Sequence, residues 1–236
     1  MNKIFVIAFK EIKTYFKSPI AYIVLVITVS VFNIFFFLII DESREANLRE
    51  VFKLMEFMFV FIVPLLTMKI FAEEKLTGTM EFLATTPTTH NQIVLGKFLG
   101  SASFLSLMII LTMIYYVIIA IFGRPDGLEA LSGYLGIWLE GLFFISIGLM
   151  TSSWTPNQII AALSSYVILL SLYVTMSILK YLSPSLEIFV RMASTWSHSE
   201  NFFAGVITTG DILYFLSGII LCLAITRLSI ENRLWR

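Results

Sequence analysis

One acidic residue lies well inside a long apolar run of this sequence, and it is the clearest candidate for chemistry. The residue is Glu140, in the segment WLEGLFF. A buried carboxyl group in a membrane is costly unless it is paired, faces water or is neutralised. Glu140 is therefore a candidate for lining a translocation path. The alternative is that it lies close enough to the outer start of its helix, expected at residue 134, to reach the membrane interface.

The residue types that usually bind metals or carry out catalysis form no recognisable arrangement. The only cysteine, Cys222, lies within an apolar run, so an intramolecular disulfide is impossible and no redox chemistry is indicated. His90 and His198 fall on opposite sides of the membrane in the topology derived below, which argues against a shared zinc site. His198 and Glu200 are neighbours, but two residues make a poor metal site and a surface pair is the commoner explanation. No Ser/His, paired-Asp or His-rich helix pattern indicates an intramembrane enzyme.

The sequence also lacks a phosphate-binding loop. Its one Gly-Lys pair, Gly96-Lys97, is followed by Phe98 and lacks the upstream glycine and the downstream Ser or Thr that cradle a phosphate. We therefore expect no cofactor in this chain, and any energy from ATP must come from another polypeptide.

Composition indicates a membrane protein. Of the 236 residues, 58% are hydrophobic and 14% are charged, and the mean hydropathy is +0.90. A soluble domain of this length could not hide so much apolar surface. A helix needs about 20 residues to cross a hydrocarbon core of about 30 Å. Six runs qualify: residues 20–40, 52–71, 93–122, 134–153, 158–182 and 212–230. Because the runs are continuous rather than alternating, we expect an all-α integral membrane protein with six transmembrane helices in a single domain, residues 1–236.

The distribution of basic residues predicts the orientation. With the amino terminus inside, ten Lys and Arg residues fall in inner segments and six in outer segments. Basic residues near span ends are retained on the cytoplasmic side, so both termini are predicted to be cytoplasmic. The first run is of full span length and no small-residue cleavage site follows it, so we expect it to act as its own insertion signal.

Residues 1–18 are predicted to form an amphipathic interfacial helix. Lysines 3, 10, 13 and 17 fall within one sector of the helix. The opposite arc gathers Ile4, Phe5, Ala8, Phe9, Ile12, Tyr15 and Phe16, whereas Val6 and Ile7 do not fit. Such a helix would rest its apolar face among acyl chains and its lysines near anionic headgroups. The alternative is a merely basic membrane-proximal segment. Ser18-Pro19 then breaks the helix and makes an elbow before the first span.

A charged stretch, FAEEKLTGTMEFLATTP at residues 71–87, separates the second and third spans and is predicted to be cytoplasmic. Thr77-Gly78 offers a break, and a short helix is expected over residues 78–86, ended by Pro87. Met80 and Leu83 would share its apolar side. A helix of about two turns is too short to be stable alone in water, so it needs a partner surface. The alternatives are that it folds back onto its own spans or lies on the lipid.

This stretch, with the aliphatic segment at residues 93–97, resembles the signature after the second span of type-2 ABC transporter permeases. The resemblance extends to EIKTYFKSPIAYIV at residues 11–24 and to HSENFFAGVITTGDILYFL at residues 198–216, so it covers nearly the whole chain. The most similar branch is that of the small permeases associated with bacterial gliding-motility loci.

The resemblance implies a site for a partner protein. In such permeases the cytoplasmic helix after the second span is a coupling helix that docks into a cleft on a separate ATPase subunit, and the amino-terminal helix flanks that interface. By position, the ATPase-coupling residues would be Glu73, Glu74, Lys75, Gly78, Thr79, Met80, Glu81, Phe82 and Leu83. The implied partners are two copies of an ABC ATPase, which bind ATP and Mg²⁺, and a second permease, either identical or related. No nucleic-acid partner is expected.

Residues 183–210 form the outer segment between the fifth and sixth spans. The resemblance implies short helices here that dip back into the outer leaflet. The alternative is an interfacial aromatic anchor made by Trp196, Phe202 and Phe203.

Two functions follow from these expectations. The first is the permease subunit of an ATP-driven exporter that alternately exposes a path between two protomers. The second is a non-transporting membrane anchor that transmits ATPase movement to an envelope machine. The aromatic, nearly uncharged spans are compatible with an amphiphilic cargo.

Overall fold

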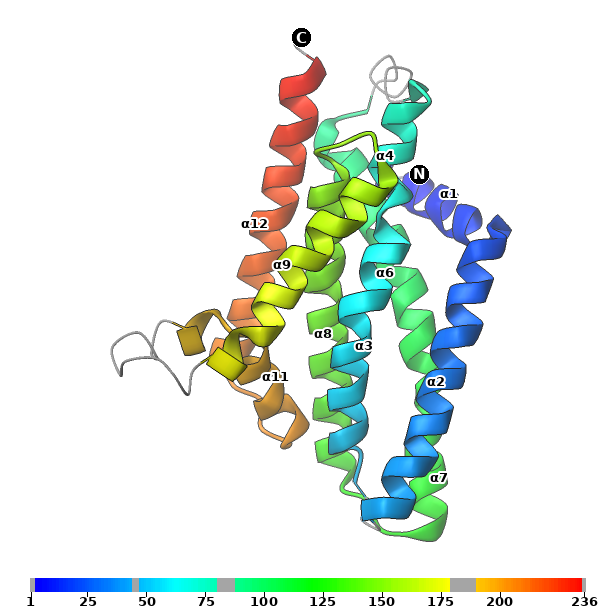
Figure 1. The fold of residues 1–236 in the computed structure, drawn as a ribbon, viewed down its shortest axis with the longest axis vertical. Helices are drawn as coiled ribbons and strands as arrows, with labels where there is room; N and C mark the ends of the chain where they lie inside the picture. The colour runs from blue at the N-terminus through cyan, green and yellow to red at the C-terminus, as the bar shows by residue number, and fades with distance from the viewer. Residues whose placement is uncertain (1–2, 44–46, 80–87, 179–189, 235–236) are drawn as a thin grey trace.

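The computed structural model describes residues 3–43, 47–79, 88–178 and 190–234, which are almost entirely helical (Figure 1). The helices in chain order are α1 (Lys3–Lys17), α2 (Pro19–Ser43), α3 (Arg49–Thr67), α4 (Lys69–Leu76), α6 (His90–Thr112), α7 (Ile114–Phe122), α8 (Gly127–Ser152), α9 (Gln158–Ile178), α11 (Thr195–Phe203) and α12 (Thr209–Leu234).

Six helical stretches in this part of the chain are long and apolar enough to cross a membrane. They are Pro19–Glu42, Arg49–Leu76, His90–Phe122, Gly127–Ser152, Gln158–Thr175 and Thr209–Glu231. The prediction of an all-helical fold is confirmed for the described residues, and these six candidate spans correspond to the six predicted apolar runs. The amino- and carboxy-terminal ends lie toward the same end of the bundle, with the end of α4 (Figure 1).

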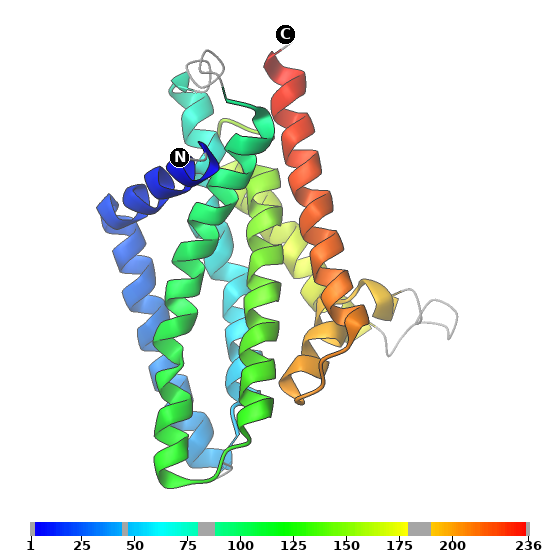
Figure 2. The same cartoon turned by 180° about the vertical axis from the view of Figure 1, so that it is seen from behind.

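Helix α8 is the centre of the bundle. Every residue from 139 to 153 is buried, which is the pattern of a helix covered on all sides. It contacts α3, α4, α6, α9, α11 and α12. Figure 2 shows α2, α6 and α7 on one side of α8 and α12 on the other side.

Glycines let the neighbours of α8 approach closely. A Cβ atom at Gly133 would lie 2.0 Å from the Phe52 ring, and one at Gly148 would lie 2.0 Å from Thr67 Oγ1. Residue numbers rise in the same direction along both helices from the first pair to the second, so α3 and α8 run parallel to each other. The start of α3 therefore packs against the start of α8, and the end against the end.

Helix α1 lies across the end of the bundle at an angle to α2, and Ser18 interrupts the helix between them (Figure 2). It packs on two glycines of α6: Gly96 faces Ile7, and Gly100 faces Glu11, with no room for a methyl group at either position. Ile7, which did not fit the predicted apolar arc, is therefore held by protein. Phe5 and Phe9 are 61% and 60% exposed, so an apolar face remains for acyl chains. Contact of that face with the membrane stays a prediction.

Helix α11 packs against the first half of α8. A Cβ atom at Gly136 would lie 2.4 Å from Phe202 Cβ, and Phe202 and Phe203 are buried. The structure therefore contradicts the alternative in which these two rings anchor the chain at the membrane interface. The insertion of this region into the outer leaflet stays a prediction, and residues 183–189 lie outside the described part of the chain.

Candidate functional site

The predicted coupling segment begins at the end of α4. Helix α4 ends at Leu76, and Gly78 takes a φ of +70°, a conformation that side chains other than glycine's rarely allow. Thr77 Oγ1 donates to the carbonyl of Glu73 at 2.9 Å, which completes the last turn. Of the predicted coupling residues, Met80, Glu81, Phe82 and Leu83 lie outside the described residues, so their helix stays a prediction.

The chain resumes a helix directly after this segment. Thr89 is the N-cap of α6: its side chain accepts the backbone N–H of Gln92, and the Gln92 side chain accepts the N–H of Thr89 at 3.1 Å. This reciprocal pair fixes the start of α6. The coupling segment is therefore bounded by α4 on one side and by a well-capped helix on the other.

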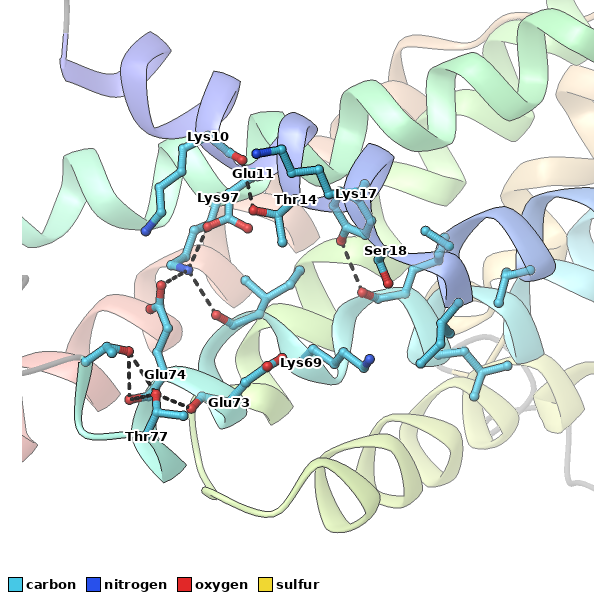
Figure 3. Close-up of a pocket in the computed structure, with 18 residues that line it drawn as sticks. Lys10, Glu11, Thr14, Lys17, Ser18, Lys69, Glu73, Glu74, Thr77 and Lys97 are labelled. Atoms are coloured by element: carbon cyan, nitrogen blue, oxygen red, sulfur yellow. Dashed lines mark hydrogen bonds and ion pairs between the residues drawn. The ribbon is translucent and has the colours of Figure 1, made fainter.

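A buried lysine joins the helices on both sides of that segment. Lys97 on α6 is 2% exposed, and its Nζ lies 3.0 Å from Glu11 Oε1 of α1 and 2.8 Å from Glu74 Oε1 of α4. Nζ also donates to the carbonyl of Ile70 at 2.9 Å, and it lies 5.1 Å from the centre of the Phe71 ring. We call Lys97, Glu11 and Glu74 the Lys97 cluster (Figure 3). It ties together the elbow helix, the end of the second span and the start of the third.

The end of α8 holds α4 from the other side. The helix is interrupted at Met68, between α3 and α4. There Ser152 Oγ accepts hydrogen bonds from the N–H groups of Phe71 and Ala72, each at 3.1 Å, and donates one to the carbonyl of Met68 at 3.0 Å. Lys75 Nζ donates to the carbonyl of Ser153. Glu74 and Lys75 therefore make contacts within the chain, whereas Glu73, Gly78 and Thr79 are exposed and available to a partner.

Tyr15 adds a second link from the elbow helix. Its hydroxyl donates to the carbonyl of Leu66 at 3.1 Å and lies 3.2 Å from Ser101 Oγ. Its ring stacks on Phe104 with 4.8 Å between centres. Burial raises the pKa of the Tyr15 phenol well above its usual range, although the Ser101 hydrogen bond opposes this, so Tyr15 stays a neutral donor.

A cavity of about 850 Å³ lies between α1, the start of α2 and the junction of α3 and α4 (Figure 3). One part of its lining is charged and the other is apolar. The charged part includes Lys10, Lys17, Lys69 and Glu73, and the apolar part includes Ile20, Ala21, Val24 and Leu65. None of the three lysines forms an ion pair with a described residue. A cavity of this composition suits a molecule with an anionic head and an apolar tail.

Glu140 lies in the middle of α8 and is completely buried. Helix α8 starts at Gly127, well before residue 134, because the Asp126 side chain accepts the Leu128 N–H at 2.9 Å and caps the helix there. Glu140 therefore does not reach the interface, and the alternative of an interfacial carboxyl is contradicted. Its role in a translocation path stays a prediction.

The sequence analysis missed the partner of Glu140. Glu56 of α3 is also buried, and the two carboxyl groups are close enough to interact. Glu56 is an acid within the predicted apolar run of residues 52–71, which is the signal that could have found it. The distance in sequence between Glu56 and Glu140 hid the pairing.

His198 and Glu200 do not meet in one site. His198 Nδ1 lies 2.6 Å from Asp211 Oδ1, whereas Glu200 Oε1 lies 3.3 Å from a guanidinium nitrogen of Arg49. Among the described residues no group of three or more His, Cys, Asp and Glu side chains could hold a metal ion. Asp211 also accepts hydrogen bonds from Asn201 at 3.0 Å and Thr208 at 2.7 Å, so this cluster fastens α11 to the start of α12.

Six candidate spans, and an amino-terminal elbow helix tied to the second of them through a buried ion cluster, define a helical multi-pass membrane protein. Over residues 5–225 the chain matches the family model described as "ABC-2 family transporter protein", and it belongs to this family. No individual curated protein matches it. Family membership supports a membrane permease subunit of an ABC transporter, a class that associates with an ABC ATPase subunit.

Proposed function

We propose that this chain is the permease subunit of an exporter in the inner membrane of a prokaryote, driven through residues 73–83 by a separate ATPase. Two ATPase copies and a second permease, identical or related, complete the assembly, and both termini face the cytoplasm. The observation that carries the proposal is the Lys97 cluster, because it joins the helices before and after the coupling segment to the elbow helix. The likeness of the sequence to gliding-motility permeases supports that branch.

The contacts explain how a push on the segment would reach the spans. A displacement of residues 78–86 acts directly on α4 and α6, and Lys97 carries it to α1 through Glu11. Ser152 passes the movement of α4 to α8, the central helix. A partner that closes on ATP would thus move the elbow and three spans together, as alternating exposure of a path requires.

The cavity beside the Lys97 cluster supports an amphiphilic cargo. Its lysines match an anionic head, and its apolar side chains match an acyl or polyprenyl chain. Its position between the elbow helix and the first two spans would give a lipid of the inner leaflet a place to leave the bilayer.

The test uses Leu83→Glu in the full chain, produced together with an ABC ATPase that co-purifies with the wild type. A charge on the predicted apolar side should abolish co-purification of the ATPase and ATP-dependent cargo movement in proteoliposomes. Leu128→Glu is the matched control, because Leu128 is 76% exposed at the opposite end of the bundle. Undiminished ATPase binding by Leu83→Glu would contradict the docking role.

Two further outcomes separate the alternatives. ATPase binding without flux of any amphiphile would favour the membrane anchor over the exporter. The topology is tested in intact cells with a membrane-impermeant maleimide in a Cys222→Ala background. Leu128→Cys should react at once, and Thr79→Cys only after permeabilisation; the reverse pattern would overturn the proposed orientation and with it the cytoplasmic docking site.

A further inference from the structure

Two buried acids face each other where α3 and α8 run side by side. Phe52 lies against Gly133, and Phe59 is 3.4 Å from the position of a Cβ atom on Gly141. Glu56 lies between those two phenylalanines in sequence, and Glu140 precedes Gly141, so both acids are held in the same stretch of the interface. Glu56 is 1% exposed and Glu140 is 0% exposed.

The polar atoms of this pair are left without partners. Glu56 Oε1, both carboxyl oxygens of Glu140 and Ser199 Oγ are buried and form no hydrogen bond with any described residue. Ser199, on α11, lies beside the Glu140 carboxyl and is itself completely buried. Buried polar atoms in folded proteins are nearly always satisfied, so this group of three side chains has unused capacity to bind something.

Among the described residues, Lys53 is the cation that acts on Glu56, but it lies one turn earlier on α3 and binds Glu50 at 2.7 Å. Glu200 on α11 adds a further acid, whose partner is Arg49. From the described parts of α9 and α12, the phenols of Tyr173 and Tyr214 face the pair. Two neighbouring carboxyl groups that are both shielded from water do not both stay ionised, because like charges repel strongly when water is excluded.

We propose that Glu56 and Glu140, with Ser199, form a binding site for an exchangeable proton shared between the two carboxyl groups. A shared proton lets one carboxyl donate to the other, and the Ser199 hydroxyl can donate to the remaining carboxylate oxygen. Divalent cations fit poorly, because Ca²⁺ takes six to eight oxygen ligands and only three side chains converge here. The site stands independently of the proposed function, since it rests on these side chains alone.

Carbodiimide labelling tests the proposal directly. Dicyclohexylcarbodiimide enters apolar regions and reacts with protonated carboxyl groups. In phosphatidylethanolamine–phosphatidylglycerol liposomes, the full-length protein should carry an adduct on Glu56 or Glu140, located by peptide mass spectrometry. The adduct should decline as pH is raised and should be equal in NaCl and choline chloride. Protection by NaCl would overturn the proton site in favour of a sodium site.

Matched variants complete the test. Glu56→Gln with Glu140→Gln should abolish the adduct while keeping the volume of both side chains, whereas Glu50→Gln, at the exposed start of α3, should leave it unchanged. Infrared spectroscopy gives a second readout that needs no reagent. The wild type should show the C=O band of a protonated carboxyl that the double variant lacks, and a wild-type spectrum without that band overturns the proposal.

Discussion

Replacing Lys97 by methionine should destabilise the protein through the two acids left behind. The methionine keeps the apolar stem of the side chain but removes the cation that Glu11 and Glu74 share at 3.0 and 2.8 Å. Breaking a buried ion pair by removing one partner costs about 3–5 kcal/mol. The side chains of Glu11 and Glu74 are 11% and 16% exposed, so some water reaches them and the lower end of that range applies. We expect a loss of about 3 kcal/mol.

The loss is measured by thermal unfolding in detergent. For a chain of this size, about 3 kcal/mol corresponds to a fall in Tm of about 6–12 °C. Adding Glu11→Gln and Glu74→Gln to Lys97→Met should restore most of the difference, because the uncompensated charges disappear with their partner. Lys10→Met is the control: Lys10 lines the same cavity but is exposed. A Tm of Lys97→Met equal to that of Lys10→Met would refute the electrostatic reasoning, as would a triple variant no more stable than the single one.

Three other predictions use the same unfolding assay. Gly148→Ala should lower stability by about 1–3 kcal/mol through overpacking, because its Cβ would lie 2.0 Å from Thr67 Oγ1. Adding Thr67→Gly to this variant should relieve most of the loss, and an unchanged Tm of Gly148→Ala would contradict the close contact. Gly78→Ala should cost about 1–2 kcal/mol through its left-handed backbone, since no described atom lies within 4 Å of the added Cβ, and Gly78→Asn should cost less; equal losses would argue against backbone strain. Asp211→Ala should cost about 1–3 kcal/mol by leaving its half-buried donors unsatisfied, and a wild-type Tm would show that the cluster does not fasten α11.

The spans and the elbow were predictable because their signals are local. Residues 1–18 and the six apolar runs carry their pattern within one or two dozen neighbouring residues, and a bilayer imposes the same length on every span. These features need no knowledge of which helices are neighbours.

The Lys97 cluster and the acid pair were not predictable because each joins distant parts of the chain. Lys97 and Glu11 are separated by 86 positions, and no local pattern connects them. Gly96-Lys97 was considered only as a failed phosphate-binding loop, although the glycine admits α1 and the lysine binds its acid. Glu11 offered a weak signal as the one acid of an otherwise basic helix.

The close seat of α1 on Gly96 and Gly100 has a mechanical consequence. Two contacts with no free space resist sliding, so we expect α1 and α6 to move as one rigid unit. The break in the helix at Ser18 lets α2 change its angle to α1. With α1 in the headgroup layer, as predicted, a pull on the chain beyond Thr79 would move α1 sideways among the headgroups. The stiffness and thickness of the bilayer would then oppose the work done by the proposed ATPase partner.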